Sequence, residues 1–151
     1  MTIDWICKKF PDLSPLELYH LLQLRSEVFV VEQNCVFLDM DDIDQECFHL
    51  MGLVENKLVA YARIVPPGIV YTEPSIGRVV TSPFVRKHGL GKQLMQQSIE
   101  LVHELFGNTS IRIGAQNYLR EFYSLFGFYQ VSDVYLEDGI EHIYMVKNAA
   151  T

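Results

Sequence analysis

The sequence predicts an α+β, or mixed α/β, fold. Segments with strand character outnumber segments with helical spacing, and turn signals typical of β-hairpins occur in both halves of the chain. The expected order is strand, helix, three strands, helix, strand, helix and two strands, which differs from the regular alternation of a doubly wound sheet. With 151 residues the chain is long enough for a substantial core, and we expect residues 1–151 to form one domain.

The composition is that of an ordinary soluble globular chain, with 49% hydrophobic and 21% charged residues. The formal net charge of -7 argues against nucleic-acid binding, which depends on basic patches. No apolar run reaches the ~18 residues that a membrane span requires, so we expect no membrane partner. The three cysteines, Cys7, Cys35 and Cys47, form no C-x-x-C pair. This cysteine usage and the lack of a secretory signal predict a cytoplasmic location.

The N-terminal half begins with an expected strand over residues 3–9, followed by a helix. Ser14 is a predicted N-cap, Pro15 occupies the first helical position and Glu17 completes a capping box. Apolar residues at helical spacing carry this helix to about Val30. Two further strands, 48–55 and 57–65, join at Asn56 in a hairpin.

A loop rich in carboxylates, residues 31–46, separates that helix from the hairpin. It does not match an EF-hand calcium loop beginning at Asp39, which needs Gly at its sixth position and Glu at its twelfth. Those positions are Asp44 and Leu50. We therefore expect no metal. A solvated acidic loop is the simpler interpretation, and an acidic rim that attracts a cationic acceptor is the more specific one.

The C-terminal half is expected to contain a strand over 75–81 and a long amphipathic helix that starts after Gly91 and stops at Gly107. Because a helix joins them, the strands 75–81 and 111–115 are candidates for parallel pairing through a right-handed crossover. A short aromatic helix follows over 118–126. Asp138-Gly139 then marks a hairpin between strands 128–136 and 140–146.

The loop from Arg86 to Gly91 opens the long helix, where free backbone N–H groups and the helix dipole favour a phosphate-bearing ligand. A P-loop does not fit, since Arg86 stands at the first glycine position and Gln93 replaces Ser or Thr. A dinucleotide fingerprint does not fit either, since Leu94 replaces the third glycine. An ordinary strand–helix turn remains the alternative.

Two motifs in order resemble the GCN5-related N-acetyltransferase (GNAT) family. Arg86-x-x-Gly89-x-Gly91 after a Val-Val strand is similar to its acetyl-CoA loop, and Phe122-Tyr123-x-x-x-Gly127-Phe128 is similar to its C-terminal motif. The run from Leu24 to Gln33, His49 and Gly77-Arg78-Val79-Val80 further resemble the ElaA-like branch. The resemblance covers nearly the whole chain. It implies the acyl-CoA N-acyltransferase fold, a central mixed twisted sheet flanked by helices.

The resemblance also implies how acetyl-CoA binds as the acyl donor. Main-chain groups of Val79 and Val80 would pair with its pantetheine arm, and Gln116 stands where many relatives carry an Asn. Tyr123 would protonate the departing thiolate, although a purely structural core aromatic is the alternative. The residues expected to hold the pyrophosphate are Arg86, Lys87, His88, Gly89, Leu90, Gly91 and Lys92.

The base and the acceptor are less defined. The strand 76–81 carries no carboxylate, so we name Glu32 and His49 as candidate bases, with structural roles open for both. Candidate acceptor-binding residues are Arg25, Glu32, Gln33 and Arg78. The resemblance implies direct attack by a primary amine on acetyl-CoA in a ternary complex. The acidic loop, from Asp39 to Glu46, suggests that this amine belongs to a cationic small molecule or to a lysine-bearing acceptor. The alternative is a non-catalytic acyl-CoA-binding or sensing module, and a homodimer through the C-terminal strands is a family-level expectation.

Overall fold

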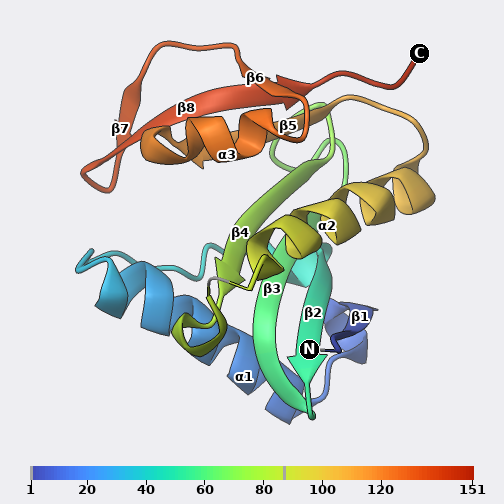
Figure 1. Cartoon of the computed structure of the whole chain (residues 1–151), viewed down its shortest axis with the longest axis vertical. Coiled ribbons are helices and arrows are strands. Elements are labelled where there is room, and N and C mark those ends of the chain that lie inside the picture. The colour runs from blue at the N-terminus through green and yellow to red at the C-terminus, as the bar shows by residue number, and fades with distance from the viewer. Residues whose placement is uncertain (1, 87) are drawn as a thin grey trace.

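A computed structural model describes residues 2–86 and 88–151, and within them the chain forms two antiparallel β-sheets and three α-helices (Figure 1). The first sheet has the strand order β1 (Asp4–Lys9), β2 (Phe48–Val54), β3 (Lys57–Val65) and β4 (Ser75–Thr81). The second has the order β5 (Ile111–Gln116), β8 (Ile140–Lys147) and β6 (Phe128–Gln130), and β7 (Tyr135–Glu137) also pairs with β8. The predicted α+β class is confirmed.

The first helix, α1 (Pro15–Arg25), starts as expected. The Ser14 hydroxyl accepts from the Glu17 backbone N–H, and the Glu17 carboxylate accepts from the Ser14 N–H, which completes the capping box. The chain then continues as a π-helix over Ser26–Glu32, two residues beyond the expected end. Mid-helix π segments are often found at functional sites, and this one borders the cavity described below.

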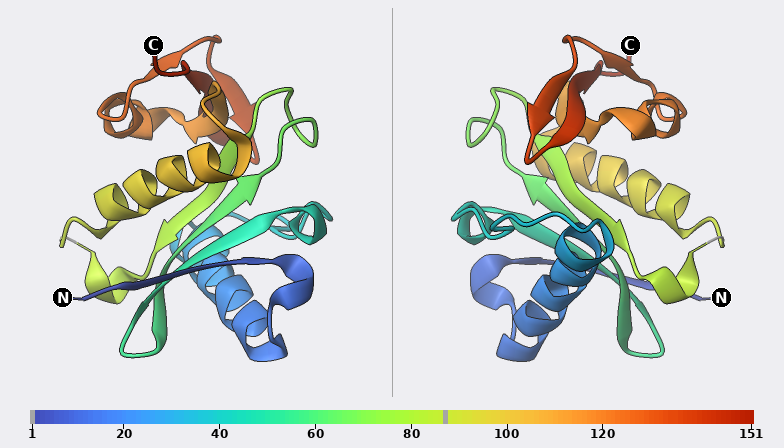
Figure 2. Two further views of the ribbon diagram at one scale, coloured as in Figure 1. Left: turned by 90° about the vertical axis from the view of Figure 1, so that its right-hand side faces the viewer. Right: turned by 90° about the vertical axis from the view of Figure 1, so that its left-hand side faces the viewer.

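Helix α2 (Leu90–Phe106) and α1 cover opposite faces of the first sheet (Figure 2). The alternation of side chains along β3 explains this arrangement. Ala60, Ala62 and Ile64 belong to the core packed by α2, whereas Tyr61 belongs to the core packed by α1. Gly107 ends α2 with φ +83° and donates its N–H to the carbonyl of His103. Helix α2 therefore stops at Gly107, as the sequence predicts.

Both predicted hairpins form. Glu55 and Asn56 link β2 to β3 with φ of 50° and 66°, and Asp138 and Gly139 link β7 to β8 with φ of 51° and 77°. Two successive residues with positive φ match the right-handed twist of the flanking strands. The strand expected over 128–136 is interrupted instead, because β6 ends at Gln130 and β7 starts at Tyr135. The short aromatic helix is α3 (Arg120–Ser124), preceded by a 3₁₀ turn at Asn117–Leu119.

The two sheets meet where β4 approaches β5. The Arg112 N–H donates to the carbonyl of Pro74 at 3.1 Å, and in the described part of the chain β4 forms a ladder with β3 alone. The expected pairing of strands 75–81 and 111–115 is therefore reduced to this contact at the start of β4. Beyond it the strands diverge, and the far edge of β4 is left without a partner strand.

Candidate active site

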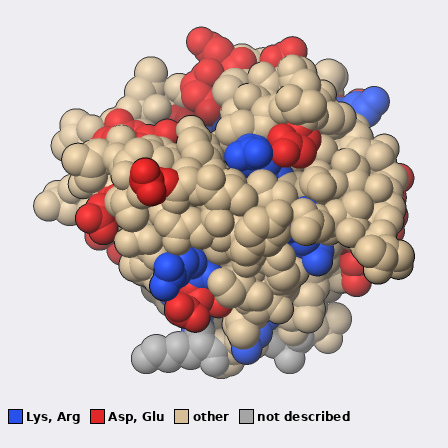
Figure 3. Space-filling view, turned by 90° about the horizontal axis from the view of Figure 1, so that it is seen from above, with Lys and Arg blue, Asp and Glu red and all other residues tan. Residues whose placement is uncertain are grey.

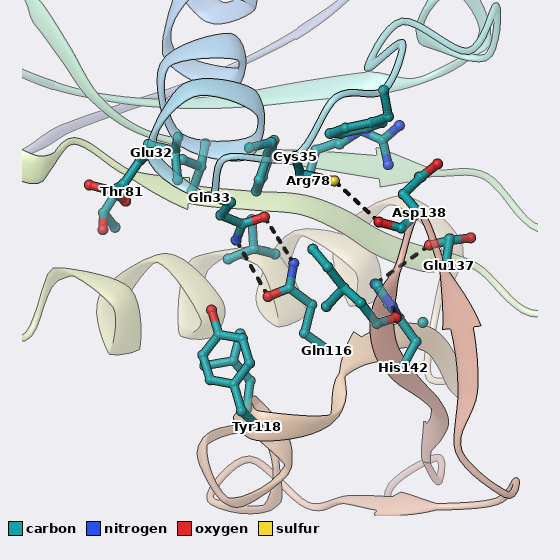
Figure 4. A pocket seen from close by; sticks show the side chains of 18 of the residues that line it. Glu32, Gln33, Cys35, Arg78, Thr81, Gln116, Tyr118, Glu137, Asp138 and His142 are labelled. Atoms are coloured by element: carbon teal, nitrogen blue, oxygen red, sulfur yellow. Dashed lines mark hydrogen bonds and ion pairs between the residues drawn. The ribbon is translucent and has the colours of Figure 1, made fainter.

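A cavity of about 620 Å³ lies where the two sheets diverge (Figure 4). One wall comes from the π-helix, the loop after it and β4. The other comes from the end of β5, the turn before α3 and the β7–β8 hairpin. Eight of the candidate residues named from the sequence lie on these walls, namely Glu32, Gln33, Arg78, Val79, Val80, Arg86, Gln116 and Tyr123.

Strand β4 contributes a bulged, unpaired edge to the cavity. Tyr61 of β3 opposes Val80 and Arg63 opposes Gly77, so that Arg78 and Val79 together face one residue of the partner strand. Arg78 adopts a φ of 50°, which a residue with a side chain rarely does. Bulges re-aim main-chain groups and are common beside active sites. Backbone groups of β4 are thereby available to a ligand that lies along this edge.

The N-terminus of α2 provides an anion cradle near the mouth of the cavity. Gly89 is the N-cap with φ +71° and has no side chain to accept from the first turn. The N–H groups of Leu90, Gly91 and Lys92 have no intrahelical acceptor, and the helix dipole favours negative charge there. The Leu90 side chain is buried in the core, while His88 and Lys92 are exposed. These residues fit a pyrophosphate group, and Lys87 lies outside the described residues.

Arg86 connects this loop to the π-helix. Its Nη2 lies 2.7 Å from Oε1 of Glu32, and about two fifths of each side chain is exposed. Glu32 is therefore more open to solvent than its apolar neighbours in the sequence suggested. Glu32 lies at the same end of the cavity as Thr81 (Figure 4), and Arg86 also lines the cavity.

A pair of amides crosses the middle of the cavity. Gln33 Nε2 donates to Gln116 Oε1 at 3.4 Å, and Gln116 Nε2 donates to Gln33 Oε1 at 3.3 Å. Gln33 follows the π-helix and Gln116 ends β5, so this contact joins the two walls. Figure 4 shows it between Glu32 and Thr81 on one side and the side chains of the β7–β8 hairpin on the other.

Tyr123 reaches the cavity from α3. Its ring is 8% exposed and packs edge-on against Phe122 and Phe128, with centroid separations of 5.2 and 6.1 Å. Burial, together with the neighbouring Tyr118, raises the pKa of Tyr123 to about 12. The phenol is therefore protonated at neutral pH and is available as a hydrogen-bond donor or acid.

The hairpin end of the cavity was not foreseen from the sequence. It brings together Cys35, Glu137, Asp138 and His142, and the Cys35 thiol donates to the Asp138 carbonyl at 3.3 Å. Asp138 served in the sequence only as a turn signal. His142 lies opposite Gln116 in the β5–β8 register, a relation that appears only once the strand pairing is known.

Two of the candidate residues, Arg25 and His49, are buried away from the cavity. Arg25, the last residue of α1, is fully buried, and its guanidinium donates to Asp39 and Asp44 at 2.8 Å each. His49 is also fully buried, and both its ring nitrogens are engaged, with the Tyr61 hydroxyl at 2.7 Å and the Asp44 carbonyl at 2.9 Å. Neither is among the residues that line the cavity, so the structure does not bring Arg25 or His49 together with the other candidate residues.

The acidic loop is an ion-pair cluster and not a solvated rim. Asp39, Asp41 and Asp44 pair with Arg25, Arg63 and Arg78, so three carboxylates meet three guanidinium groups. Burial alone would raise the pKa of Asp41, but hydrogen bonds from Arg63 and its charge outweigh burial and lower the pKa to about 2. Arg78 lines the cavity but holds Asp39 at 2.7 Å, which ties the bulge of β4 to this loop.

On the face shown in Figure 3, acidic side chains gather near the edges and basic side chains are scattered. Within residues 2–86 and 88–151, no group of three or more His, Cys, Asp or Glu side chains is placed to hold a metal ion. Over the same residues, no helix has both the length and the apolar character needed to cross a membrane.

Known proteins resemble this chain over nearly its whole length. The family model for the acetyltransferase (GNAT) domain matches residues 24–149. A UPF0039 protein of Synechocystis is 44% identical over 147 residues, which cover 97% of this chain and 96% of the relative. A structure of an acyl-CoA N-acyltransferase from Pseudomonas aeruginosa is 42% identical, with a TM-score of 0.92 and coverage of 97% and 99%. The structure of Escherichia coli ElaA is 40% identical, with a TM-score of 0.90 and coverage of 97% and 100%.

Proposed function

Because the chain belongs to the GNAT acetyltransferase family, as an ElaA-like member, we propose that it transfers an acetyl group from acetyl-CoA to a primary amine. The observation that carries the proposal is one cavity that combines the bulged edge of β4 with Tyr123, close to the anion cradle of α2. Its Pseudomonas aeruginosa relative is described as an acyl-CoA N-acyltransferase, which supports an acyl-CoA donor.

The donor is proposed to lie along β4. The amide groups of its pantetheine arm pair with main-chain groups of Val79 and Val80, as an added strand would. Its pyrophosphate accepts from the first N–H groups of α2, and Gln116 offers an amide that can both donate and accept. Arg86, beside the cradle, adds positive charge.

In the proposed reaction the amine attacks the thioester directly, in a ternary complex. The nitrogen lone pair forms the new bond to the carbonyl carbon, and the carbon–sulfur bond breaks. Tyr123 then donates its proton to the departing thiolate. The raised pKa of its phenol keeps the proton on Tyr123 at neutral pH until that step. Glu32 stays a candidate base, although its ion pair with Arg86 favours a place at the donor end.

The proposed acceptor is a small-molecule amine or a lysine side chain, and we expect the reaction to take place in the cytoplasm. Opposite the donor end, the cavity walls carry the carboxylates of Glu137 and Asp138. They supply the negative charge that the acidic loop was expected to supply, since the loop's own buried carboxylates are occupied by arginines. A homodimer through the C-terminal strands stays a prediction.

The test is a substrate screen. Purified protein receives acetyl-CoA with ethylamine, cadaverine, spermidine, phenethylamine or Nα-acetyl-lysine, and free thiol and acetylated product are measured. We expect thiol release with at least one amine and a loss of 10²-fold or more in kcat for Tyr123→Phe. The control is Tyr129→Phe, on the exposed strand β6, with unchanged activity.

A negative screen has a distinct meaning. If acetyl-CoA binds in calorimetry but no amine supports thiol release, the chain is better described as a non-catalytic acyl-CoA-binding module. If acetyl-CoA does not bind, the proposed donor site itself is wrong.

A further inference from the structure

His142 occupies a defined place at the hairpin end of the cavity. It lies on β8 between its cross-strand neighbours Gln116 of β5 and Tyr135 of β7. Residues that face each other across antiparallel strands share one face of the sheet. The imidazole stacks on the Tyr135 ring at 5.8 Å and an interplanar angle of 27°. Only 10% of its side chain is exposed, and it lines the cavity. The ring is therefore held rigidly at the cavity wall.

The hydrogen bond of His142 identifies its tautomer. Nδ1 lies 2.8 Å from the carbonyl oxygen of Ile140. A carbonyl can only accept, so Nδ1 carries the hydrogen, and in the neutral ring the lone pair resides on Nε2. Nε2 lies 3.5 Å from Oε2 of Glu137, which also lines the cavity. The geometry thus provides a buried imidazole with its basic nitrogen beside a carboxylate.

The proposed reaction requires such a group. A primary amine is mostly an ammonium ion at neutral pH and cannot attack until it loses a proton. Strand β4 carries no carboxylate, Glu32 is paired with Arg86, and both nitrogens of His49 are engaged. An imidazole exchanges protons near neutral pH, which suits it to this step.

We propose that His142 is the general base of the reaction, an inference that rests on the proposed acetyl transfer. The acceptor's ammonium gives one proton to Nε2, and the freed lone pair attacks the thioester carbon. As the carbon–sulfur bond breaks, the thiolate takes the Tyr123 proton. The nitrogen then returns its surplus proton to the tyrosinate, and the imidazolium releases its proton to water. The sum is an amide, a thiol and one proton.

The charges around His142 favour a cationic acceptor. Glu137 and Asp138 come from the hairpin, and Asp41 and Arg78 line the cavity from the opposite wall. Asp41 and Arg78 are engaged in the ion-pair cluster, so Glu137 and Asp138 are the carboxylates left to attract an ammonium group. The Glu137 carboxylate also stabilises the imidazolium that forms. Tyr135, on whose ring the imidazole stacks, and Tyr144, which stacks on Tyr135, complete the surroundings on the sheet side.

The test is His142→Gln, which keeps a polar side chain but removes the basic nitrogen. With the best acceptor of the amine panel, we expect kcat/KM at pH 7 to fall by about 10²–10⁴-fold, while the dissociation constant for acetyl-CoA stays within about twofold. The variant depends on amine that has already lost its proton in solution. Its log kcat/KM should therefore rise with unit slope toward the amine's own pKa, whereas the wild-type profile levels off at lower pH.

Matched controls separate this role from a structural one. His20→Gln removes an exposed histidine of α1 and should leave the pH profile unchanged. Glu137→Gln should move the acidic limb of the wild-type profile toward lower pH, because the imidazolium loses its neighbouring carboxylate. Glu141→Gln should not, since Glu141 is exposed and adjacent residues of a strand face opposite sides.

The outcomes distinguish the two proposals. If the wild type acetylates an amine but His142→Gln stays within threefold, or its profile parallels the wild type, His142 is not the base. If His142→Gln does not fold, the Glu137→Gln variant decides: an acidic limb of its kcat/KM profile at the same pH as in the wild type overturns the inference. If the wild type acetylates no amine, it is the acetyl transfer that fails.

Discussion

Two regions of the molecule bury polar side chains in different ways. In the first sheet and at the end of α1, both nitrogens of His49 and the guanidinium of Arg25 are engaged by neighbouring side chains and carbonyls. At the cavity, His142 uses Nδ1 on a carbonyl and turns Nε2 toward Glu137. Both histidines are buried on strands. What separates them is how much of their hydrogen-bonding capacity is already used, so burial by itself does not mark a functional residue.

The charges differ in the same way. In the Arg–Asp cluster of residues 25, 39, 41, 44, 63 and 78, the arginines and aspartates pair with one another. Because most of these side chains are buried, water cannot easily replace a lost partner. The Arg86–Glu32 pair is exposed and lies beside the anion cradle. Substitutions in the cluster should therefore act on stability, and substitutions at the exposed pair should act on binding.

The largest expected effect is the loss of Asp44. Its Oδ1 accepts from Arg25 Nη1 at 2.8 Å and from Arg63 Nη1 at 2.9 Å. Asp44→Ala leaves two buried guanidinium groups short of a partner and should lower the free energy of unfolding by about 3–5 kcal/mol. The measurement is urea denaturation, with the exposed Glu46→Ala as a control that should stay within about 0.5 kcal/mol. Equal effects at the two positions would contradict the structural role of the cluster.

Acid should weaken the same cluster. The pKa of Asp41 is lowered to about 2 in the folded chain, because the hydrogen bonds and charge of Arg63 outweigh the effect of burial. A carboxyl whose pKa is lower in the folded state stabilises above its unfolded value of about 3.9, and this stability is lost as pH falls from about 4 toward 2. We expect a contribution of about 1–2 kcal/mol, discounted because Asp41 is partly exposed.

Urea midpoints between pH 6 and pH 2.5 measure this loss. Asp41→Asn removes the titrating group, so its stability should vary less than the wild type's between pH 4 and pH 2.5. A variant with the same steep decline would show that other carboxyl groups dominate the acid response.

Much of the fold could be predicted from local signals. The capping box at Ser14 and Glu17, the two hairpin turns and the glycine stop of α2 each depend on residues near one another in the chain. The π-helix and the break between β6 and β7 could not be predicted in this way. No turn or capping signal in the sequence marks the change from α- to π-helix at Ser26 or the end of β6 at Gln130.

The site residues also differ in whether local sequence could predict them. The loop before α2 and Tyr123 belong to contiguous motifs, so a sequence pattern can propose them. His142 enters the cavity through its register with Gln116, and Glu137 through the same hairpin. The positions of Arg25 and His49 depend on Asp39 and Asp44, which looked in the sequence like members of a solvated loop. The position of each of these four residues depends on strand pairing or on contacts between distant parts of the chain. A single sequence does not show such contacts.

A smaller effect is expected at the exposed pair. Arg86→Gln should weaken acetyl-CoA binding about fivefold, or ~1 kcal/mol, since an exposed cation near a pyrophosphate adds only part of the binding energy. The free energy of unfolding should change by less than about 0.5 kcal/mol. Calorimetry with acetyl-CoA measures the first and urea denaturation the second. The control is Arg120→Gln, at an exposed arginine of α3, which should change neither quantity. If Arg86→Gln lost stability but not acetyl-CoA binding, the exposed pair would behave like the Arg–Asp cluster, and the contrast between them would be wrong.

The smallest effect is expected at Glu32. Its carboxylate is exposed and paired with Arg86 at the end of the cavity away from His142, so Glu32→Gln should change kcat/KM by less than about threefold. Steady-state kinetics with the best acceptor, over the same pH range as for His142→Gln, provide the measurement. If kcat/KM of Glu32→Gln instead fell 10²-fold and its pH profile lost the acidic limb, Glu32 would be the base. Proton transfer would then take place at the exposed Arg86–Glu32 pair and not at His142.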